Sequence, residues 1–254
     1  MMKNNFIKTP YLPEKKVQWV LVDYRVDDKT LNNLQLRGIN IIKTLPCHDL
    51  YEAVEGHPDM VLHPLGGQDI IVAPNVFSYY KDKLEPLGFH IIEGKTLLTR
   101  NYPENIAYNI CRVGNFLIHN FKYTDEILLN YYSRPSYIKI HVSQGYSKCS
   151  IAVINEEAII TADAGIHREV TKFGIDSLMI DEGNILLPGL NYGFIGGTCG
   201  YLDSNYLAFF GKIQDYKNYE KISKFAEKYG KSLIAINEKA LQDYGTLIPL
   251  TEMD

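Results

Sequence analysis

Apolar and polar positions follow one order that recurs four times along the chain. An apolar run is followed by a tight polar turn and a second apolar run, then by a helical stretch and a third apolar run. The four copies span residues 60–93, 107–142, 149–181 and 196–237. Short apolar runs bounded by turn residues are typical of strands, and longer amphipathic stretches are typical of helices. The pattern therefore predicts four β-β-α-β units.

The predicted hairpin turns are regularly spaced. Asp69, Asn115, Glu157 and Asn205 fall at equivalent turn positions, roughly 45 residues apart, a period of the size that marks repeat architectures. An ordinary doubly wound sheet with coincidental spacing is the alternative. Such a sheet alternates single strands with helices, whereas each unit here brings two strands joined by a tight turn. The spacing favours the repeat.

The two ends of the chain complete a fifth unit. Residues 17–44 contain a strand, a helix and a further strand, but no preceding hairpin partner, and residues 243–250 form an apolar strand left over at the C-terminus. If the last strand pairs with the first unit, the ring closes and leaves no exposed sheet edge. The prediction is a five-bladed α/β propeller, closed by the C-terminal strand and forming a single domain over residues 1–254.

Local chemistry at the predicted helix ends agrees with these boundaries. Gly88 and Gly174 stand where a helix must stop and the chain must reverse, a role for a residue that accepts positive φ. Asp125 and Asp215 are predicted to begin helices, because an aspartate side chain can accept hydrogen bonds from the first free amides.

Composition narrows the class of protein. The 254 residues are 46% hydrophobic and 22% charged, with a formal net charge of −4. Without a basic excess, a nucleic-acid partner is not expected, and without a long apolar run or signal peptide we expect a soluble, cytoplasmic protein that binds no membrane. The four cysteines suit neither a disulfide framework nor the paired spacing of a zinc site, so they are interpreted as free thiols and no cofactor or metal is expected. The oligomeric state is left open.

Five β-β-α-β units in a ring resemble the pentein superfamily of guanidino-group-modifying enzymes. The superfamily includes arginine deiminase, agmatine deiminase, dimethylarginine dimethylaminohydrolase and the amidinotransferases, and a non-catalytic relative is the ribosome anti-association initiation factor. The resemblance covers nearly the whole chain and rests on the module pattern more than on motifs. The chain is most similar to a bacterial branch that lacks the standard catalytic set.

The resemblance implies where catalytic residues would lie. In the enzymes, a cysteine attacks the guanidinium carbon, a His-x-Asp pair assists, and carboxylates hold the guanidinium nitrogens. Asp59 fills the place of a substrate-holding aspartate. In the next unit Glu104 lies too early for the family's glutamate, and Tyr108 or Asn109 fills the aspartate position.

The remaining catalytic positions differ from the family pattern. Tyr146 stands near the expected histidine and Lys148 near its aspartate. Gly245 occupies the place of the nucleophile, shortly before Pro249 and Leu250, and no cysteine follows Cys199. The resemblance therefore implies that the usual deiminase mechanism is lost, as in a pseudoenzyme.

The segment Gly193–Gly200, with the sequence GFIGGTCG, is the most unusual local sequence. Gly196 and Gly197 could let the backbone approach a ligand, and Cys199 beside them could be a relocated nucleophile; crowded strand ends are the alternative. Hairpin alignment places His63 in register with Cys199, so a catalytic pair is possible, although a histidine hydrogen-bonded within the strand layer is the favoured interpretation.

The sequence is compatible with three functions. The first is a pentein-fold protein that holds a small cationic or guanidino-type ligand at the propeller axis, near Asp59, Asn109, Tyr146, Asp243 and the glycine segment. The second is an amidinohydrolase or deiminase that uses Cys199 with His63. The third is a protein-interaction scaffold.

Overall fold

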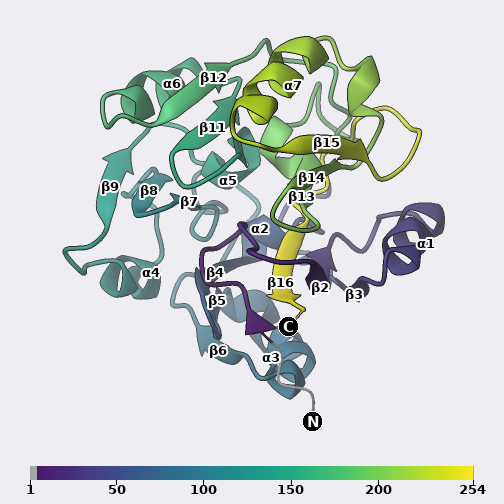
Figure 1. Cartoon of the computed structure of the whole chain (residues 1–254). Helices are drawn as coiled ribbons and strands as arrows, with labels where there is room; N and C mark the ends of the chain where they lie inside the picture. The colour runs from purple at the N-terminus through teal and green to yellow at the C-terminus, as the bar shows by residue number, and fades with distance from the viewer. Residues whose placement is uncertain (1–4, 254) are drawn as a thin grey trace.

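The strands of the protein lie in five separate sheets within residues 5–253, the part of the chain that the computed structural model describes (Figure 1). The N-terminal sheet has the order β1 (Asn5–Phe6), β16 (Ile248–Glu252), β2 (Val17–Val22) and β3 (Asn40–Lys43). The other sheets have three strands each: β4 (Leu62–Gly66), β5 (Asp69–Val72) and β6 (His90–Glu93); β7 (Cys111–Val113), β8 (Phe116–His119) and β9 (Ile138–His141); β10 (Ile151–Val153), β11 (Ala158–Thr161) and β12 (Asp176–Met179); β13 (Cys199–Tyr201), β14 (Tyr206–Phe209) and β15 (Ser232–Ala235).

All five sheets share one pairing scheme. In each three-stranded sheet the first two strands form an antiparallel hairpin, and the third strand runs parallel to the second. In the N-terminal sheet, β16 takes the place of the first strand, antiparallel to β2, which is parallel to β3. The four hairpins predicted from the sequence are confirmed, and so is the pairing of a C-terminal strand with the first unit, although that strand is Ile248–Glu252 rather than 243–250.

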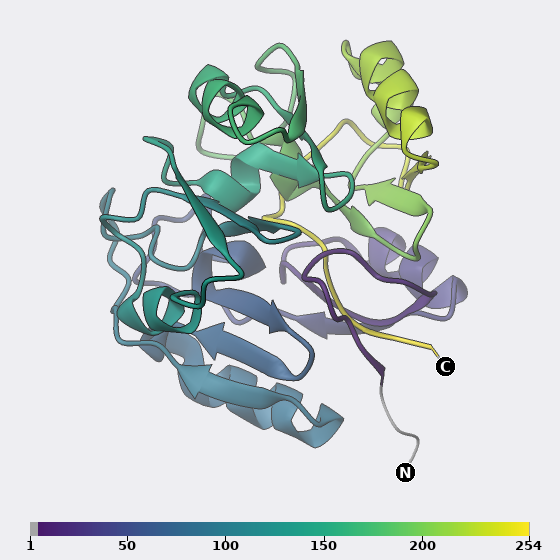
Figure 2. The same ribbon diagram turned by 60° about the vertical axis from the view of Figure 1, so that its left-hand side comes forward.

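The longer α-helices connect the second and third strands of the sheets, and one-turn helices precede the first strand of some of them. The α-helices are α1 (Asp28–Leu36), α2 (Pro58–Val61), α3 (Phe77–Leu84), α4 (Glu126–Tyr131), α5 (Ser147–Ser150), α6 (Ala164–Thr171) and α7 (Tyr219–Lys228). The 3₁₀ helices are η1 (Pro74–Val76), η2 (Glu85–Leu87), η3 (Ile195–Thr198) and η4 (Ile213–Asp215). Figures 1 and 2 show α1, α3, α4, α6 and α7 toward the outside of the molecule, and Figure 1 shows the one-turn helices α2 and α5 nearer its middle.

Helix ends follow local sequence chemistry in most units. The Asp125 side chain accepts hydrogen bonds from the amides of Ile127 and Leu128 and caps α4, as predicted. Gly88 and Gly174 have φ values of 95° and 81° after helical segments, also as predicted. The prediction for Asp215 was wrong: this residue ends η4, and α7 begins only at Tyr219.

Burial decreases across each sheet from the first strand to the third. Strands β4, β7, β10, β13 and β16 are almost entirely buried, whereas β3, β6, β9, β12 and β15 are mostly half-buried or exposed. A strand buried on both faces reads as a continuous apolar run, and an outer strand carries polar residues toward water. The first strands therefore form the interior of this mixed α/β fold.

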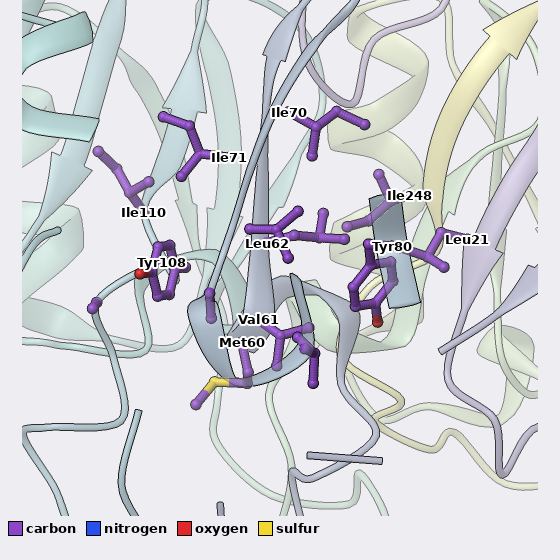
Figure 3. Packing of buried hydrophobic residues seen from close by; sticks show 14 of the residues in the cluster. Leu21, Met60, Val61, Leu62, Ile70, Ile71, Tyr80, Tyr108, Ile110 and Ile248 are labelled. Atoms are coloured by element: carbon purple, nitrogen blue, oxygen red, sulfur yellow. The ribbon is translucent and has the colours of Figure 1, made fainter. Parts of the chain in front are cut away.

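The largest apolar cluster joins the N-terminal sheet to the sheet of β4–β6. Figure 3 shows Leu21, Leu62, Ile70, Tyr80 and Ile248 packed around α2 and β4. Fully burying an aliphatic side chain contributes about 1.5–3 kcal/mol, so contacts between sheets are a large part of the stability. No helix within residues 5–253 is both long enough and apolar enough to cross a membrane.

We expect replacement of Leu250 by Ala to lower the free energy of unfolding by about 2–5 kcal/mol, because Leu250 lies in β16 and is 2% exposed within the largest cluster. The matched control is Leu36→Ala, at a position that is 85% exposed, with an expected change within about 0.5 kcal/mol. Denaturant unfolding measures both. Equal effects of the two substitutions would show that β16 is not part of the core.

Candidate functional site

Residues placed just before the first strand of each sheet meet in one buried cluster. We call it the central cluster; its members are Asp59 in α2, Asn109 before β7, Lys148 and Cys149 in α5, Gly196 in η3, and Thr246 before β16. Each side chain of the cluster is at most 3% exposed. One equivalent position from every sheet therefore contributes to the same site.

Hydrogen bonds join the members of the central cluster from one sheet to the next. Asn109 Nδ2 donates to the Asp59 carbonyl at 2.9 Å, and Asn109 Oδ1 accepts from the Lys148 amide at 2.8 Å. Lys148 Nζ lies 3.5 Å from the Gly196 carbonyl oxygen. Thr246 Oγ1 lies 3.0 Å from that same carbonyl and 2.7 Å from Asp59 Oδ2. The series of contacts thus begins and ends at Asp59.

The Lys148 ammonium is the buried cation of the site. It donates to Thr246 Oγ1 at 3.0 Å and to the Ile151 carbonyl at 3.3 Å, and it lies 4.9 Å from the centre of the Tyr11 ring. A buried ammonium is costly unless anions, acceptors or aromatic faces surround it. Because the Thr246 hydroxyl oxygen accepts a hydrogen bond from Lys148, its O–H group can donate a hydrogen bond to the nearby Asp59 carboxylate.

Asp59 and Cys149 face each other inside the cluster. Burial raises the pKa of Asp59 to about 6, although the Lys148 charge and hydrogen bonds from Thr246 and Cys149 act in the opposite direction. Cys149 Sγ lies 3.3 Å from both carboxylate oxygens of Asp59, and Asn109 Nδ2 lies 3.2 Å from the sulfur. Burial, with the charges of Asp59 and Asp243, raises the pKa of Cys149 well above its usual value, so the thiol is protonated at neutral pH.

Asp243 is a second buried carboxylate beside the cluster. Its oxygens accept hydrogen bonds from the amides of Phe194, at 2.8 Å, and Gly245, at 2.9 Å. Burial raises its pKa to about 7; the Phe194 amide lowers it and the Asp59 charge raises it further. The site therefore holds two carboxylates whose ionisation depends on what binds next to them.

His57 lies between Asp243 and the central cluster with no hydrogen-bond partner for either ring nitrogen. Its Nδ1 is 3.8 Å from Asp243 Oδ1, and the residue is 1% exposed. Burial, together with the Arg25 charge, lowers the pKa of His57 to about 3, so the imidazole is neutral. A buried and unpaired imidazole is unusual, because buried polar atoms are normally hydrogen-bonded.

The glycines of the segment Gly193–Gly200 make room for this arrangement. A Cβ atom on Gly197 would lie 1.8 Å from Asp243 Oδ1, and one on Gly196 would lie 2.2 Å from the Ile151 carbonyl oxygen. The amides of Tyr244 and Thr246 donate to the Gly197 carbonyl. The segment therefore packs its backbone directly against Asp243 and the chain that leads into β16.

A surface pocket of about 480 Å³ reaches Asp243 from outside. Charged residues of both signs line it: Arg25, Glu52, Glu55, Arg100 and Asp243. The remaining lining residues are Tyr24, Tyr51, Ala53, Leu187, Pro188, Gly189, Gln242 and Tyr244. Arg25 is paired with Asp23, whereas Glu52 and Arg100 are exposed. The pocket thus offers separate anionic and cationic groups to a small ligand.

The structure places Cys199 and His63 in different surroundings. Cys199 Sγ lies 3.6 Å from the Ile195 carbonyl oxygen, and burial raises its pKa to about 12. His63 has its ring nitrogens next to the hydroxyls of Tyr132, at 2.7 Å, and Tyr11, at 3.5 Å. No hydrogen bond joins Cys199 to His63 in the described chain, so their use as a catalytic pair stays an untested hypothesis.

The other residues singled out from the sequence lie in or near the cluster. Asp59, Asn109 and Gly196 are members, and Gly197 and Asp243 border it. Tyr146 is half-buried at the start of α5, and its hydroxyl is hydrogen-bonded to Asn105.

Sequence reasoning missed His57, Thr246 and the roles of Lys148 and Cys149. Thr246, Lys148 and Cys149 share one feature: each lies two or three residues before the first strand of a sheet. That position could have identified them.

Solved structures of two amidinotransferases and an agmatine deiminase have a similar fold. The chain is similar to the inosamine-phosphate amidinotransferase StrB1 of Streptomyces griseus, with a TM-score of 0.59 and 11% identity over 97% of each chain. It is also similar to SxtG, an amidinotransferase of Microseira wollei from the saxitoxin biosynthetic pathway, with a TM-score of 0.56 and 13% identity over 90% of this chain and 91% of the other. The C. jejuni agmatine deiminase is similar with a TM-score of 0.53 and 10% identity, over 93% of this chain and 92% of the other. At these identities the likeness establishes the fold alone.

Within this fold, the chain belongs to the family described as "Family of unknown function (DUF6873)", whose model matches residues 21–248. No curated protein matches it in sequence. The expectation of a pentein-like α/β fold is therefore confirmed, and the activity has to be argued from the site.

We expect Gly197→Ala to destabilise the protein by more than about 1 kcal/mol, because the added methyl group overlaps the Asp243 carboxylate. Asp243→Ala removes the three atoms that the methyl group would meet first. A double-mutant cycle by denaturant unfolding should therefore show a smaller cost of Gly197→Ala in the Asp243→Ala background. The same cost in both backgrounds would mean that the glycine is not there to accommodate Asp243.

Proposed function

We propose that the protein binds a small cationic or guanidino-type ligand in the pocket that ends at Asp243, without the standard deiminase chemistry. The observation that carries the proposal is the position of Asp243, a buried carboxylate at the inner wall of a pocket with charged walls. Small-molecule sites typically combine such a concave space with a few well-placed polar groups. We also place the protein in the cytoplasm, on the sequence grounds given above.

We further propose that the five sheets are the blades of one closed propeller domain, with the pocket at one end of its axis. Three observations support this arrangement. The sheets share one pairing scheme, and burial decreases from the first to the third strand in each. The hydrogen-bond series that leaves Asp59 through Asn109 and Lys148 returns to it through Gly196 and Thr246.

The charges of the pocket suit a ligand with a cationic end and an anionic end. A guanidinium group presents a planar fork of donors that matches a carboxylate such as Asp243 or Glu52. At the other end, the exposed Arg100 could pair with a ligand carboxylate. This combination favours an arginine-like compound over agmatine, which has no carboxylate.

The surroundings of Gly245, where the family resemblance places the nucleophile, leave no room for a cysteine side chain. A Cβ atom there would lie 2.2 Å from His57 Cβ, and the residue has a φ of 70°. A cysteine at this place would collide with His57 and strain the backbone. Asn109 and Lys148 stand where the family resemblance implies acid and base groups, and neither is a carboxylate or an imidazole.

An amidinohydrolase that uses Cys199 and His63 is the competing proposal. A catalytic cysteine is normally accessible and has a lowered pKa, whereas Cys199 is 3% exposed and has a raised one. The third possibility, a protein-interaction scaffold, would leave the pocket without a small ligand. Binding and product formation separate the three.

We expect calorimetry to detect arginine binding to the full-length chain without release of ammonia or citrulline. Asp243→Asn and Glu52→Gln should each weaken binding about tenfold or more, since a hydrogen bond to a charged group contributes about 1.5–3 kcal/mol. Glu52 is exposed, so its substitution tests the pocket without risk to the core. Agmatine should bind less tightly than arginine.

The matched control is Asp82→Asn, an exposed carboxylate in α3 outside the pocket, which should leave the affinity unchanged. Absence of binding by both compounds would refute the ligand proposal. Citrulline formation that disappears in Cys199→Ala would replace it with the amidinohydrolase.

A further inference from the structure

His57, Asp59 and Cys149 form a group of metal-binding side chains that the proposed ligand pocket does not explain. The ligand atoms of the three side chains lie within 4.8 Å of one another, and all three residues are buried. The spacing of the cysteines along the chain gave no sign of such a site, because its three ligands come from two distant segments of the sequence.

We propose that these three residues bind a Zn²⁺ ion, with Asp243 as the fourth ligand. Zinc prefers a tetrahedral set of thiolate, imidazole and carboxylate ligands. In such a set, bond lengths of about 2.0–2.3 Å place neighbouring ligand atoms about 3.3–3.6 Å apart. Cys149 Sγ is already 3.3 Å from Asp59, and His57 Nδ1 is 3.8 Å from Asp243 Oδ1. Asp243 lies outside the group whose ligand atoms are all within 4.8 Å of one another, so its carboxylate has to move toward the other three ligands when the ion binds.

The unpaired imidazole of His57 is the independent observation that points to a ligand. Both ring nitrogens are buried without a hydrogen-bond partner, and a bound cation would give one of them a partner. His57 is held in place by its surroundings: a Cβ atom on Gly245 would already overlap its side chain. The imidazole thus faces Asp243 at 3.8 Å in a fixed position with an unused lone pair.

Neighbouring groups support two of the proposed ligands, Asp59 and Cys149. Thr246 Oγ1 donates to Asp59 Oδ2 at 2.7 Å, and Asn109 Nδ2 approaches Cys149 Sγ at 3.2 Å. Such outer hydrogen bonds orient the ligand atoms and tune their affinity for the ion.

Charge balance also favours a divalent ion. A thiolate and two carboxylates bring three negative charges, and the Zn²⁺ ion together with the buried Lys148 ammonium brings three positive ones. The site would be neutral overall, as a buried cluster requires. Binding deprotonates the Cys149 thiol and any Asp243 that is protonated, and these protons leave to solvent as the bonds to the metal form.

The surface pocket supplies an entry path, because Asp243 lines it and also faces His57. Asp243 takes part in both proposals, so the metal is titrated without arginine and arginine is titrated into the chelator-treated protein. A metal titration and an arginine titration therefore give separate answers.

Cobalt titration of the chelator-treated full-length protein tests the site. We expect one Co²⁺ per chain, a thiolate-to-cobalt charge-transfer absorption, release of about one to two protons per ion near neutral pH, and displacement by Zn²⁺ with a Kd below about 1 µM. Cys149→Ser should abolish the absorption band. The matched control is Cys199→Ser, because the Cys199 sulfur is also buried but lies near backbone carbonyl oxygens only.

Absence of stoichiometric Co²⁺ or Zn²⁺ binding by the unaltered protein would overturn the proposal, whether or not the variants fold. A band that persists in Cys149→Ser, or that is lost equally in Cys199→Ser, would also overturn it. So would a metal-independent release of ammonia that requires Cys149, because that result would make the thiol a nucleophile.

Discussion

The buried charge of Lys148 is the constraint on which the centre of this protein depends. An ammonium that is 3% exposed has to be surrounded by acceptors and compensated by anions. Thr246 and two backbone carbonyls accept from it, and the Asp59 carboxylate lies one hydrogen bond further on. Because these groups come from different sheets, the requirement to satisfy one cation also fixes how the sheets meet.

This constraint explains why glycines and short helices gather at the same place. Each first strand is preceded by a compact turn that brings its polar group inward, as α2 does for Asp59 and α5 for Lys148. Gly196 and Gly197 leave space for the backbone of Ile151 and the side chain of Asp243. The polar centre is therefore built from the segments that lead into strands, while the strands supply the apolar layer around it.

Much of the fold could be predicted from the sequence, because hairpins and helices leave local patterns. The turn at Asn115 and the helix stop at Gly174 are decided by neighbouring residues, and both were located correctly, whereas Asp69 is the first residue of β5 rather than part of its turn. The start of α7 was missed: Asp215 has the right side chain for a cap, but a 3₁₀ turn comes first. The pairing of β16 with β2 was predictable only from the count of strands, since no local signal links the two ends of the chain.

The site was predictable only in part. The family resemblance named Asp59 and Asn109, and the unusual glycine segment named Gly196; all three lie in the central cluster, whereas the thiol singled out from the sequence was Cys199 and the thiol in the cluster is Cys149. Cys199 is the first residue of β13 and its sulfur lies near backbone carbonyls; Cys149 lies in the turn before β10 and its sulfur faces Asp59. The position of a cysteine relative to the start of its strand, a difference of a few residues, decides whether its thiol enters the cluster. Where each strand starts depends in turn on packing between distant segments of the chain.

The most direct test of the central claim is a double-mutant cycle on Lys148 and Asp59, measured by denaturant unfolding of the metal-free protein. Lys148→Met should cost about 3–5 kcal/mol, because it leaves buried carboxylates without a cation. In the Asp59→Asn background the same substitution should cost at least about 1 kcal/mol less. Additive effects, or a Lys148→Met variant as stable as the unaltered protein, would contradict the role given to this buried charge.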